Sequence, residues 1–217
     1  MPTPGIDMEQ LDWRDVTEPI RPELTVWPGD QSFTARPSAR IARGDTANVS
    51  TIALSTHTGT HCDAPWHFLD DGKRVHELDP TLFIGPAQVL DCRGVKQIDA
   101  DDLGPGPFPK RVLIKTDNAD IPLTAPFKED FAALTVDAAE RLTEAGVGLV
   151  GIDYFSVAPF PDQSPVHHVL LGAEVLIVEN LRLAPIPPGP SALIVMPMLL
   201  QGMDGAPCRA FVGLART

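Results

Sequence analysis

The chain has 217 residues and a formal net charge of −12, with 43% hydrophobic and 21% charged residues. This length and composition are ordinary for a globular protein and predict one domain spanning residues 1–217. An acidic chain disfavours nucleic acid and anionic membranes as partners, because both attract Lys and Arg. No run approaches the roughly 18 apolar residues that a transmembrane helix needs.

Cysteine usage and the N-terminal residues bear on the cellular compartment. Cys62, Cys92 and Cys208 are too few and too scattered for a disulfide framework, which favours a reducing environment. Residues 1–9 carry neither the basic nor the apolar stretch of a signal peptide, so none is expected. These features predict a cytoplasmic protein.

The first half of the chain is predicted to form strands. We expect strands at 24–27 and 47–56, with a turn at 28–30 between them. Residues 87–92 and 111–116 are two further strands. The last of these has the nearly continuous apolar centre of a strand that is covered on both faces.

The clearest helix is predicted at 136–145. Thr135 suits the N-cap, and Gly146 suits the left-handed position after the helix. An apolar strand at 147–153 follows at once. Together with the strand at 111–116, these elements predict a βαβ unit with a parallel pair of strands.

The remaining predicted elements are a short helix at 166–172 and strands at 175–179, 192–196 and 208–214. Strands therefore outnumber helices. The expected fold class is α/β, with a β-rich mixed sheet, few helices, and a functional site at strand ends.

The most informative motif is His57-Thr-Gly-Thr-His61-Cys-Asp63-Ala-Pro65-Trp-His67, which holds three imidazoles and a carboxylate within a short run. These are ligand types for catalytic zinc, manganese and iron(II). Several threonines, a glycine and Pro65 favour a strand ending in a turn over a helix. Alternate strand residues share a face, so His57, His61 and Asp63 are predicted to bind one metal ion, with His67 beside them.

More distant ligand candidates lie in the second half of the chain. His167 and His168 are adjacent, and the sequence does not separate them. Glu179 ends an apolar strand, where an ionised carboxylate needs either a strong partner such as a metal or contact with solvent. Asp153 ends another strand and either positions a group in the pocket or caps Ser156.

The motif resembles the signature of the cyclase-type metal-dependent hydrolases, a family that includes bacterial kynurenine formamidase and isatin hydrolase. The resemblance covers nearly the whole chain. Its segments are 26–30, 57–67, 151–153, 167–168, 178–181 and 203–210.

The resemblance implies a set of metal ligands. His57, His61 and Asp63 would bind a first metal ion. Asp63 would bridge to a second ion, held by His167 and Glu179. The cofactor implied is Zn²⁺, as one or two ions, with Mn²⁺ as the alternative.

The resemblance also implies roles for His67 and Trp27, a fold and an assembly. His67 would be the general acid/base, and Trp27 would contact an aromatic substrate. The fold would be a swivelling β/β/α domain, assembled as a homodimer or homotetramer. Trp66 and Phe68 depart from the kynurenine formamidase pattern, and this affects the substrate more than the chemistry.

The predicted function is a metal-dependent amidohydrolase that cleaves an aryl formamide such as N-formyl-kynurenine. A bound zinc ion lowers the pKa of its water to about 7, and His67 can transfer the proton. One alternative is a hydrolase of a cyclic amide or lactone, of the isatin hydrolase type, and a dehydratase or true cyclase is another. A non-catalytic metal-binding protein is the third, although such a site has no need of His67.

Overall fold

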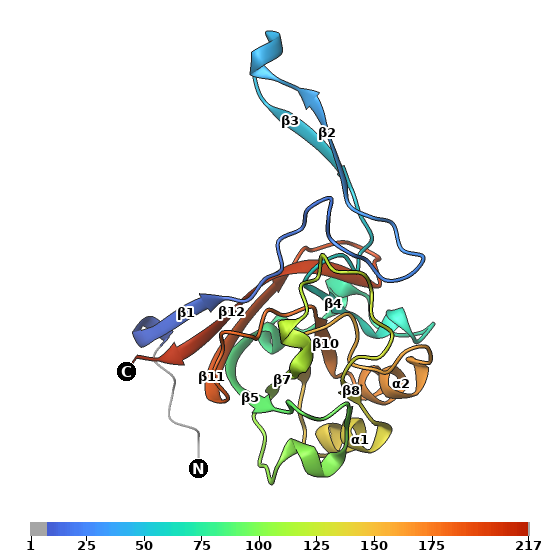
Figure 1. Ribbon diagram of the computed structural model, residues 1–217, viewed down its shortest axis with the longest axis vertical. Helices are drawn as coiled ribbons and strands as arrows, with labels where there is room; N and C mark the ends of the chain where they lie inside the picture. The colour runs from blue at the N-terminus through green and yellow to red at the C-terminus, as the bar shows by residue number, and fades with distance from the viewer. Residues whose placement is uncertain (1–7, 217) are drawn as a thin grey trace.

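The structure, a computed structural model, describes residues 8–216 (Figure 1). Most of the segment for which no signal peptide is expected, residues 1–7, lies outside the described residues. Among the residues that are described, no helix combines the length and the apolar character needed to cross a bilayer.

The main sheet has eight strands in the order β1-β12-β11-β5-β7-β9-β10-β4, and β12 also pairs with β4. Seven strands therefore close into a barrel, with β1 added beside β12. The strands are β1 (Leu11–Asp15), β4 (His61–Asp63), β5 (Ile84–Asp91), β7 (Arg111–Lys115), β9 (Leu149–Ile152), β10 (Leu176–Glu179), β11 (Gly189–Pro197) and β12 (Gly205–Ala215). A short second sheet pairs β6 (Gln97–Ile98) with β8 (Ala133–Leu134).

Strands β5, β7, β9 and β10 run parallel to one another, and the other pairings of the main sheet are antiparallel. The predicted βαβ unit is confirmed, because helix α1 (Val136–Glu144) connects strands β7 and β9 of this parallel set. The Thr135 hydroxyl accepts a hydrogen bond from the Ala138 amide, as its role of N-cap requires. The second helix, α2 (Ser164–Gly172), packs against α1.

Side chains of the parallel strands alternate between two apolar cores. Leu113 of β7 belongs to the core shared with β10, β11 and β12. Its neighbours Val112 and Ile114 belong to a second core, which takes in Leu142 of α1 and Leu170 of α2. Burial on both faces explains why the centres of β7, β9 and β10 are apolar, and the predicted β-rich α/β fold with few helices is confirmed.

The strand predicted at 24–27 is wrong, although the turn that follows it is present. The Thr25 amide donates to the Leu123 carbonyl, and the Thr25 hydroxyl donates to the Ala125 carbonyl. The segment is thus tied to a loop and adds no strand to the sheet. The Asp30 amide donates to the Trp27 carbonyl and closes the predicted turn at 28–30.

The strand predicted at 47–56 is shorter than expected and is not part of the main sheet. It forms β3 (Val49–Ala53), which pairs with β2 (Thr34–Ala39) in a hairpin projecting from the barrel (Figure 1). We call residues 34–53 the arm. Gly59 has a positive φ of 66°, and a Cβ there would lie 2.9 Å from Ile20 Cγ1. The chain therefore turns between the arm and β4, and His57 lies in that turn and not on the strand.

Candidate metal centre

The His57–His67 motif gathers its side chains around Asp63, even though His57 is not on the predicted strand. Strand β4 carries His61 and Asp63, which are both buried. Asp63 Oδ1 lies 2.9 Å from His57 Nδ1 and 3.4 Å from His61 Nε2. The three side chains therefore converge, as predicted from the alternation of side chains along a strand. His57, however, reaches the group from a turn and not from the strand.

Glu179 joins this group through strand pairing. It is the antiparallel register partner of His61, at the end of the apolar strand β10. Its Oε2 atom lies 3.5 Å from His61 Nε2, and its Oε1 atom accepts a hydrogen bond from the Val157 amide at 2.8 Å. Glu179 is thus a buried carboxylate facing histidines, and the solvent-exposed alternative is wrong.

Helix α2 brings His167 to the same place and turns His168 away. His167 Nε2 lies 3.8 Å from Asp63 Oδ2 and 3.7 Å from Glu179 Oε1. The His168 ring is exposed, with Ser164 and the Phe68 carbonyl as its hydrogen-bond partners. The fold therefore distinguishes two histidines that the sequence could not.

Backbone carbonyls fix the direction of two of these rings. Nδ1 of His61 is 2.8 Å from the Gly59 carbonyl, and Nδ1 of His167 is 2.9 Å from the Gln163 carbonyl. A carbonyl only accepts, so each Nδ1 carries the proton and each Nε2 is directed at the carboxylates. This is the arrangement in which a neutral imidazole binds a metal.

The electrostatics of the centre fit a cation. Burial alone would lower the pKa of His61, but hydrogen bonds from its ring to Asp63 and Glu179 raise that pKa to about 10. Burial likewise opposes ionisation of Asp63, yet its bonds to His57 and His61 hold its pKa well below the ordinary value. Asp63 Oδ2 is buried without a hydrogen-bond partner.

The spacing of the donor atoms also fits a cation. Ligand atoms of His61, Asp63 and Glu179 all lie within 4.8 Å of one another, and the three residues are buried. Nitrogen and carboxylate oxygen donors at this spacing suit a divalent metal ion. Such an ion would provide a partner for Asp63 Oδ2, which has no hydrogen-bond partner.

His67 lies at the edge of the cluster. It ends a short 3₁₀ helix, Pro65–His67, and its ring stacks on that of His57 with centroids 4.0 Å apart. Its side chain is 30% exposed, unlike the buried His61. His57, Asp63 and His67 also form a group whose ligand atoms lie within 4.8 Å, so the geometry accommodates His67 either as a free base or as a ligand.

Two neighbours of the centre were missed by sequence reasoning. The Asp204 carboxylate lies 2.8 Å from His57 Nε2, and the only sequence signal for it was its place in the Met203-Asp-Gly stretch of the family resemblance. The Phe68 ring stacks on His167, with centroids 4.2 Å apart. The sequence marks Phe68 only as a departure from the kynurenine formamidase pattern.

A pocket of about 130 Å³ opens onto the centre. The Trp27 ring is half-buried and packs on Phe127 and Phe160, with centroid distances of 5.1 and 5.6 Å, so it belongs to an aromatic wall. The pocket is lined by Trp27, Asp30, His57, His61, His67, Phe68, Phe155, Gln163, His167 and Glu179.

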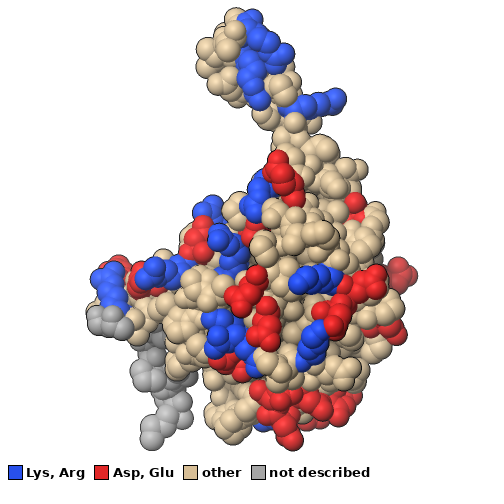
Figure 2. Space-filling view, in the orientation of Figure 1, with Lys and Arg blue, Asp and Glu red and all other residues tan. Residues whose placement is uncertain are grey.

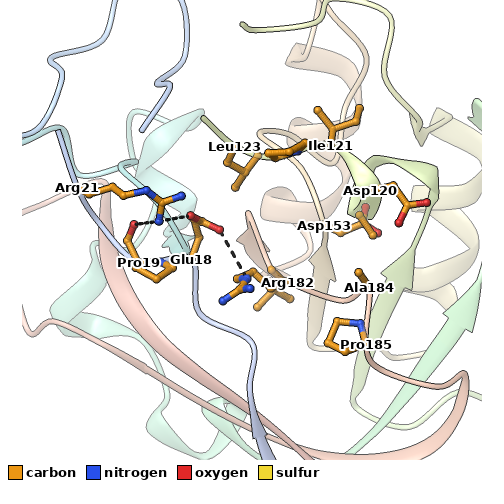
Figure 3. A pocket seen from close by; sticks show the side chains of 13 residues that line it. Glu18, Pro19, Arg21, Asp120, Ile121, Leu123, Asp153, Arg182, Ala184 and Pro185 are labelled. Atoms are coloured by element: carbon orange, nitrogen blue, oxygen red, sulfur yellow. Dashed lines mark hydrogen bonds and ion pairs between the residues drawn. The ribbon is translucent and has the colours of Figure 1, made fainter. Parts of the chain in front are cut away.

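A larger pocket of about 340 Å³ shares none of these lining residues (Figure 3). Arg21 and Arg182 flank Glu18 on one of its sides, and Asp153 lies on another. Asp153 therefore lines a pocket other than the one at the centre. Its carboxylate accepts hydrogen bonds from both the amide and the hydroxyl of Thr116. We place the candidate chemistry at the smaller pocket, because the converging imidazoles and carboxylates are there.

Comparisons with known proteins agree with this geometry. The chain is similar to kynurenine formamidase of Bacillus cereus, with 34% identity over 94% of this chain and 99% of that protein. It also resembles the structure of a predicted metal-dependent hydrolase from Bacillus stearothermophilus, with a TM-score of 0.81, 29% identity, and coverage of 94% and 98%. Isatin hydrolase A from Labrenzia aggregata, bound to benzyl benzoate, shares the fold, with a TM-score of 0.84 at 20% identity over 97% and 96%.

The family described as "Putative cyclase" matches residues 14–159, which include the arm and the whole His57–His67 motif. This match covers more than half of the chain, and the similarity to the Bacillus cereus protein extends over nearly all of it. The chain belongs to the cyclase family.

Proposed function

We propose that this protein is a metal-dependent amidohydrolase that cleaves an aryl formamide such as N-formyl-kynurenine. The observation that carries the proposal is the buried convergence of histidines and carboxylates on Asp63, beside the partly exposed His67. The similarity to kynurenine formamidase of Bacillus cereus supports the choice of substrate.

In this proposal, His57, His61 and Asp63 would hold a first metal ion. His167 and Glu179 would hold a second one, with Asp63 as a ligand shared by both. The mixed nitrogen and oxygen donor set supports zinc, with manganese as the alternative.

When bound, zinc would polarise the formyl carbonyl and lower the pKa of a coordinated water to about 7. His67 accepts a proton as the water oxygen attacks the formyl carbon. It then returns the proton to the leaving nitrogen as the carbon–nitrogen bond breaks, which releases formate and an arylamine. Trp27 and Phe68 present ring faces to the aryl group.

The test combines metal analysis with a substrate screen. Purified protein is analysed for bound metals and assayed on N-formyl-kynurenine, formanilide, isatin and an aromatic lactone. Formate release from the two formamides, lost in His61→Ala, is the expected result. Bound metal without hydrolysis of any of the four compounds would overturn the proposal in favour of a non-catalytic metal-binding protein.

The cyclic-amide alternative is favoured by the aromatic wall of the pocket. Trp27 and Phe155 line the same pocket as His67, and a fused aromatic ring such as that of isatin could lie against them. Ring opening of isatin at a rate above that of formanilide would make this second function the correct one.

We also propose that the chain assembles as a homodimer or homotetramer through the arm. Isolated two-stranded hairpins are marginally stable in water, and Ile41, Val49 and Ile52 of the arm are 50–58% exposed. The arm carries three arginines and one acidic residue, whereas the chain as a whole has a net charge of −12 (Figure 2). The basic arm and the acidic remainder of the chain have opposite charges, and the arm exposes apolar side chains. Both features support the proposal that the arm packs against a second copy of the chain.

Sedimentation measurements test this assembly. Wild-type protein is expected to sediment as a dimer or tetramer, and the paired change Val49→Glu with Ile52→Glu is expected to give monomers. Leu199→Glu, at a site on the barrel that is 81% exposed, is the matched control for an added charge. A monomeric wild-type protein at micromolar concentration would contradict the proposal.

Two further expectations belong with this proposal. The main sheet uses strands from Leu11 to Ala215, which supports one hydrolase domain over the whole chain. Cys62, Cys92 and Cys208 are all free and buried, which supports a reducing, cytoplasmic location.

A further inference from the structure

Asp204 touches two of the histidines at the centre. Its Oδ2 atom lies 2.8 Å from His57 Nε2 and 3.6 Å from His67 Nδ1. Its Oδ1 atom accepts a hydrogen bond from the Thr56 hydroxyl at 3.2 Å. One carboxylate therefore meets the edges of two stacked rings, and a separate hydrogen bond fixes its own orientation.

The pairing of β12 with β4, which closes the barrel, brings the Asp204 carboxylate to the centre. Asp204 directly precedes β12, where Gly205 is the register partner of Asp63 on β4. The Asp204 carbonyl accepts a hydrogen bond from the Ala64 amide at 2.8 Å. A Cβ on Gly205 would lie 2.7 Å from His57 Cε1, so the glycine allows the imidazole to lie against the strand.

The contact determines which nitrogen of His57 faces Asp63. A neutral imidazole carries a proton on only one nitrogen, and the carboxylate of Asp204 can only accept. When Nε2–H donates to Asp204, Nδ1 keeps its lone pair and faces Asp63 Oδ1, 2.9 Å away. Imidazoles that bind a metal are commonly held by an outer carboxylate in this manner.

The same carboxylate faces His67. With Nδ1 directed at Asp204, the remaining nitrogen, Nε2, is left for proton transfer. The His57 and His67 rings are inclined by only 28° to each other, so a shift in one ring displaces the other. Asp204 is thus placed to hold both rings at once.

We propose that Asp204 is a positioning residue that fixes the tautomer of His57 for metal binding and aligns His67 for proton transfer. The proposal rests on the proposed hydrolase function, because it assigns these two histidines different tasks within it. Asp204 is not among the residues that line the pocket at the centre, so it would act through the two histidines.

The test compares Asp204→Asn with wild type and with Asp204→Glu. Zinc affinity in the Asn variant is expected to fall by about 10- to 100-fold, as measured by competition with a chelator. At saturating zinc, kcat should fall at least tenfold while KM changes less than about threefold. The Glu variant, which keeps a carboxylate, should recover part of both losses.

Asp15→Asn is the matched control. It removes a carboxylate of β1 that pairs with Arg209 of β12 and does not line the pocket at the centre, and it should leave zinc affinity and kcat unchanged. Thermal melts establish that each variant is folded. Should the Asn variant not fold, Thr56→Val, which removes only the hydrogen bond to Oδ1, takes its place with smaller losses in the same direction.

A readout independent of hydrolysis separates this inference from the proposed function. Long-range ¹⁵N NMR of the zinc-loaded protein is expected to show His57 protonated at Nε2, with that signal lost or shifted in Asp204→Asn. A wild-type protein that binds zinc without hydrolysing formamides would overturn the proposed function alone. Wild-type zinc affinity and an unchanged His57 signal in the folded Asn variant would overturn the role of Asp204.

Discussion

Glu179 and His61 are register partners in the antiparallel pair of β10 and β4, with the carboxylate Oε2 3.5 Å from the imidazole Nε2. The two residues are far apart in the chain, and β10 is apolar up to Glu179. Pairing of the two strands therefore determines that a buried charge meets a buried imidazole. The candidate metal site is therefore assembled across a sheet, from strands distant in the sequence.

His67→Ala is expected to separate metal binding from catalysis. In the proposed mechanism His67 transfers protons and is not one of the five metal ligands, so the variant should keep nearly all of its metal. Hydrolysis should fall by roughly a hundredfold or more, because the proposed general acid/base is lost. His61→Ala should lose metal and activity together.

Metal analysis and initial rates on the same preparations check this prediction. A His67→Ala protein as depleted of metal as His61→Ala would make His67 a ligand. Full activity in His67→Ala would rule out the proposed mechanism.

Trp27→Ala is expected to weaken binding of an aryl formamide. The Trp27 ring belongs to the aromatic wall of the pocket, where it packs on Phe127 and Phe160. KM should rise by about tenfold, with a smaller change in kcat. Trp13→Ala, on the edge strand β1, is the control and should leave KM unchanged. Equal KM values for wild type and Trp27→Ala would assign this ring to the core alone.

Removal of metal is expected to destabilise the fold. Two carboxylates, Asp63 and Glu179, are buried together, and a bound cation would stabilise the native state. A ligand at a thousand times its dissociation constant contributes about 4 kcal/mol to stability. Chelator should therefore lower the melting temperature by several degrees, and added zinc should restore it. His61→Ala should melt at the same temperature with or without zinc, and an unresponsive wild-type protein would argue against a high-affinity site.

Asp153 is expected to make stability depend on pH. Burial raises the pKa of Asp153 from 3.8 to about 7, although hydrogen bonds from Thr116 oppose the shift. Between these values the folded state retains a proton that the unfolded chain has lost, so the free energy of unfolding should fall as pH rises. The expected loss between pH 5 and pH 7 is roughly 2–3 kcal/mol relative to Asp153→Asn, which cannot titrate.

Urea unfolding of both proteins at several pH values measures this difference. Well above pH 7 the two curves should run parallel, because Asp153 is then ionised in both states. A constant difference across the whole range would show that this carboxyl group stays ionised when folded.

The sequence by itself determined the local features. Thr135 and Gly146 define the ends of α1 through capping and a left-handed φ, interactions within a few residues. The apolar centre of residues 111–116 predicted that this strand is buried on both faces, and it is. The short run from His57 to Asp63 likewise held three of the candidate ligands, which their close spacing in sequence keeps within reach of one another.

The tertiary structure decided what depends on distant segments. His167 and His168 are chemically identical, and only the packing of α2 directs the first at Asp63 and leaves the second exposed. Asp204 meets His57 because β12 closes the barrel against β4. The stretch around Thr25 has the composition of a strand but is tied to a loop, since strand formation requires a partner edge that local sequence does not specify.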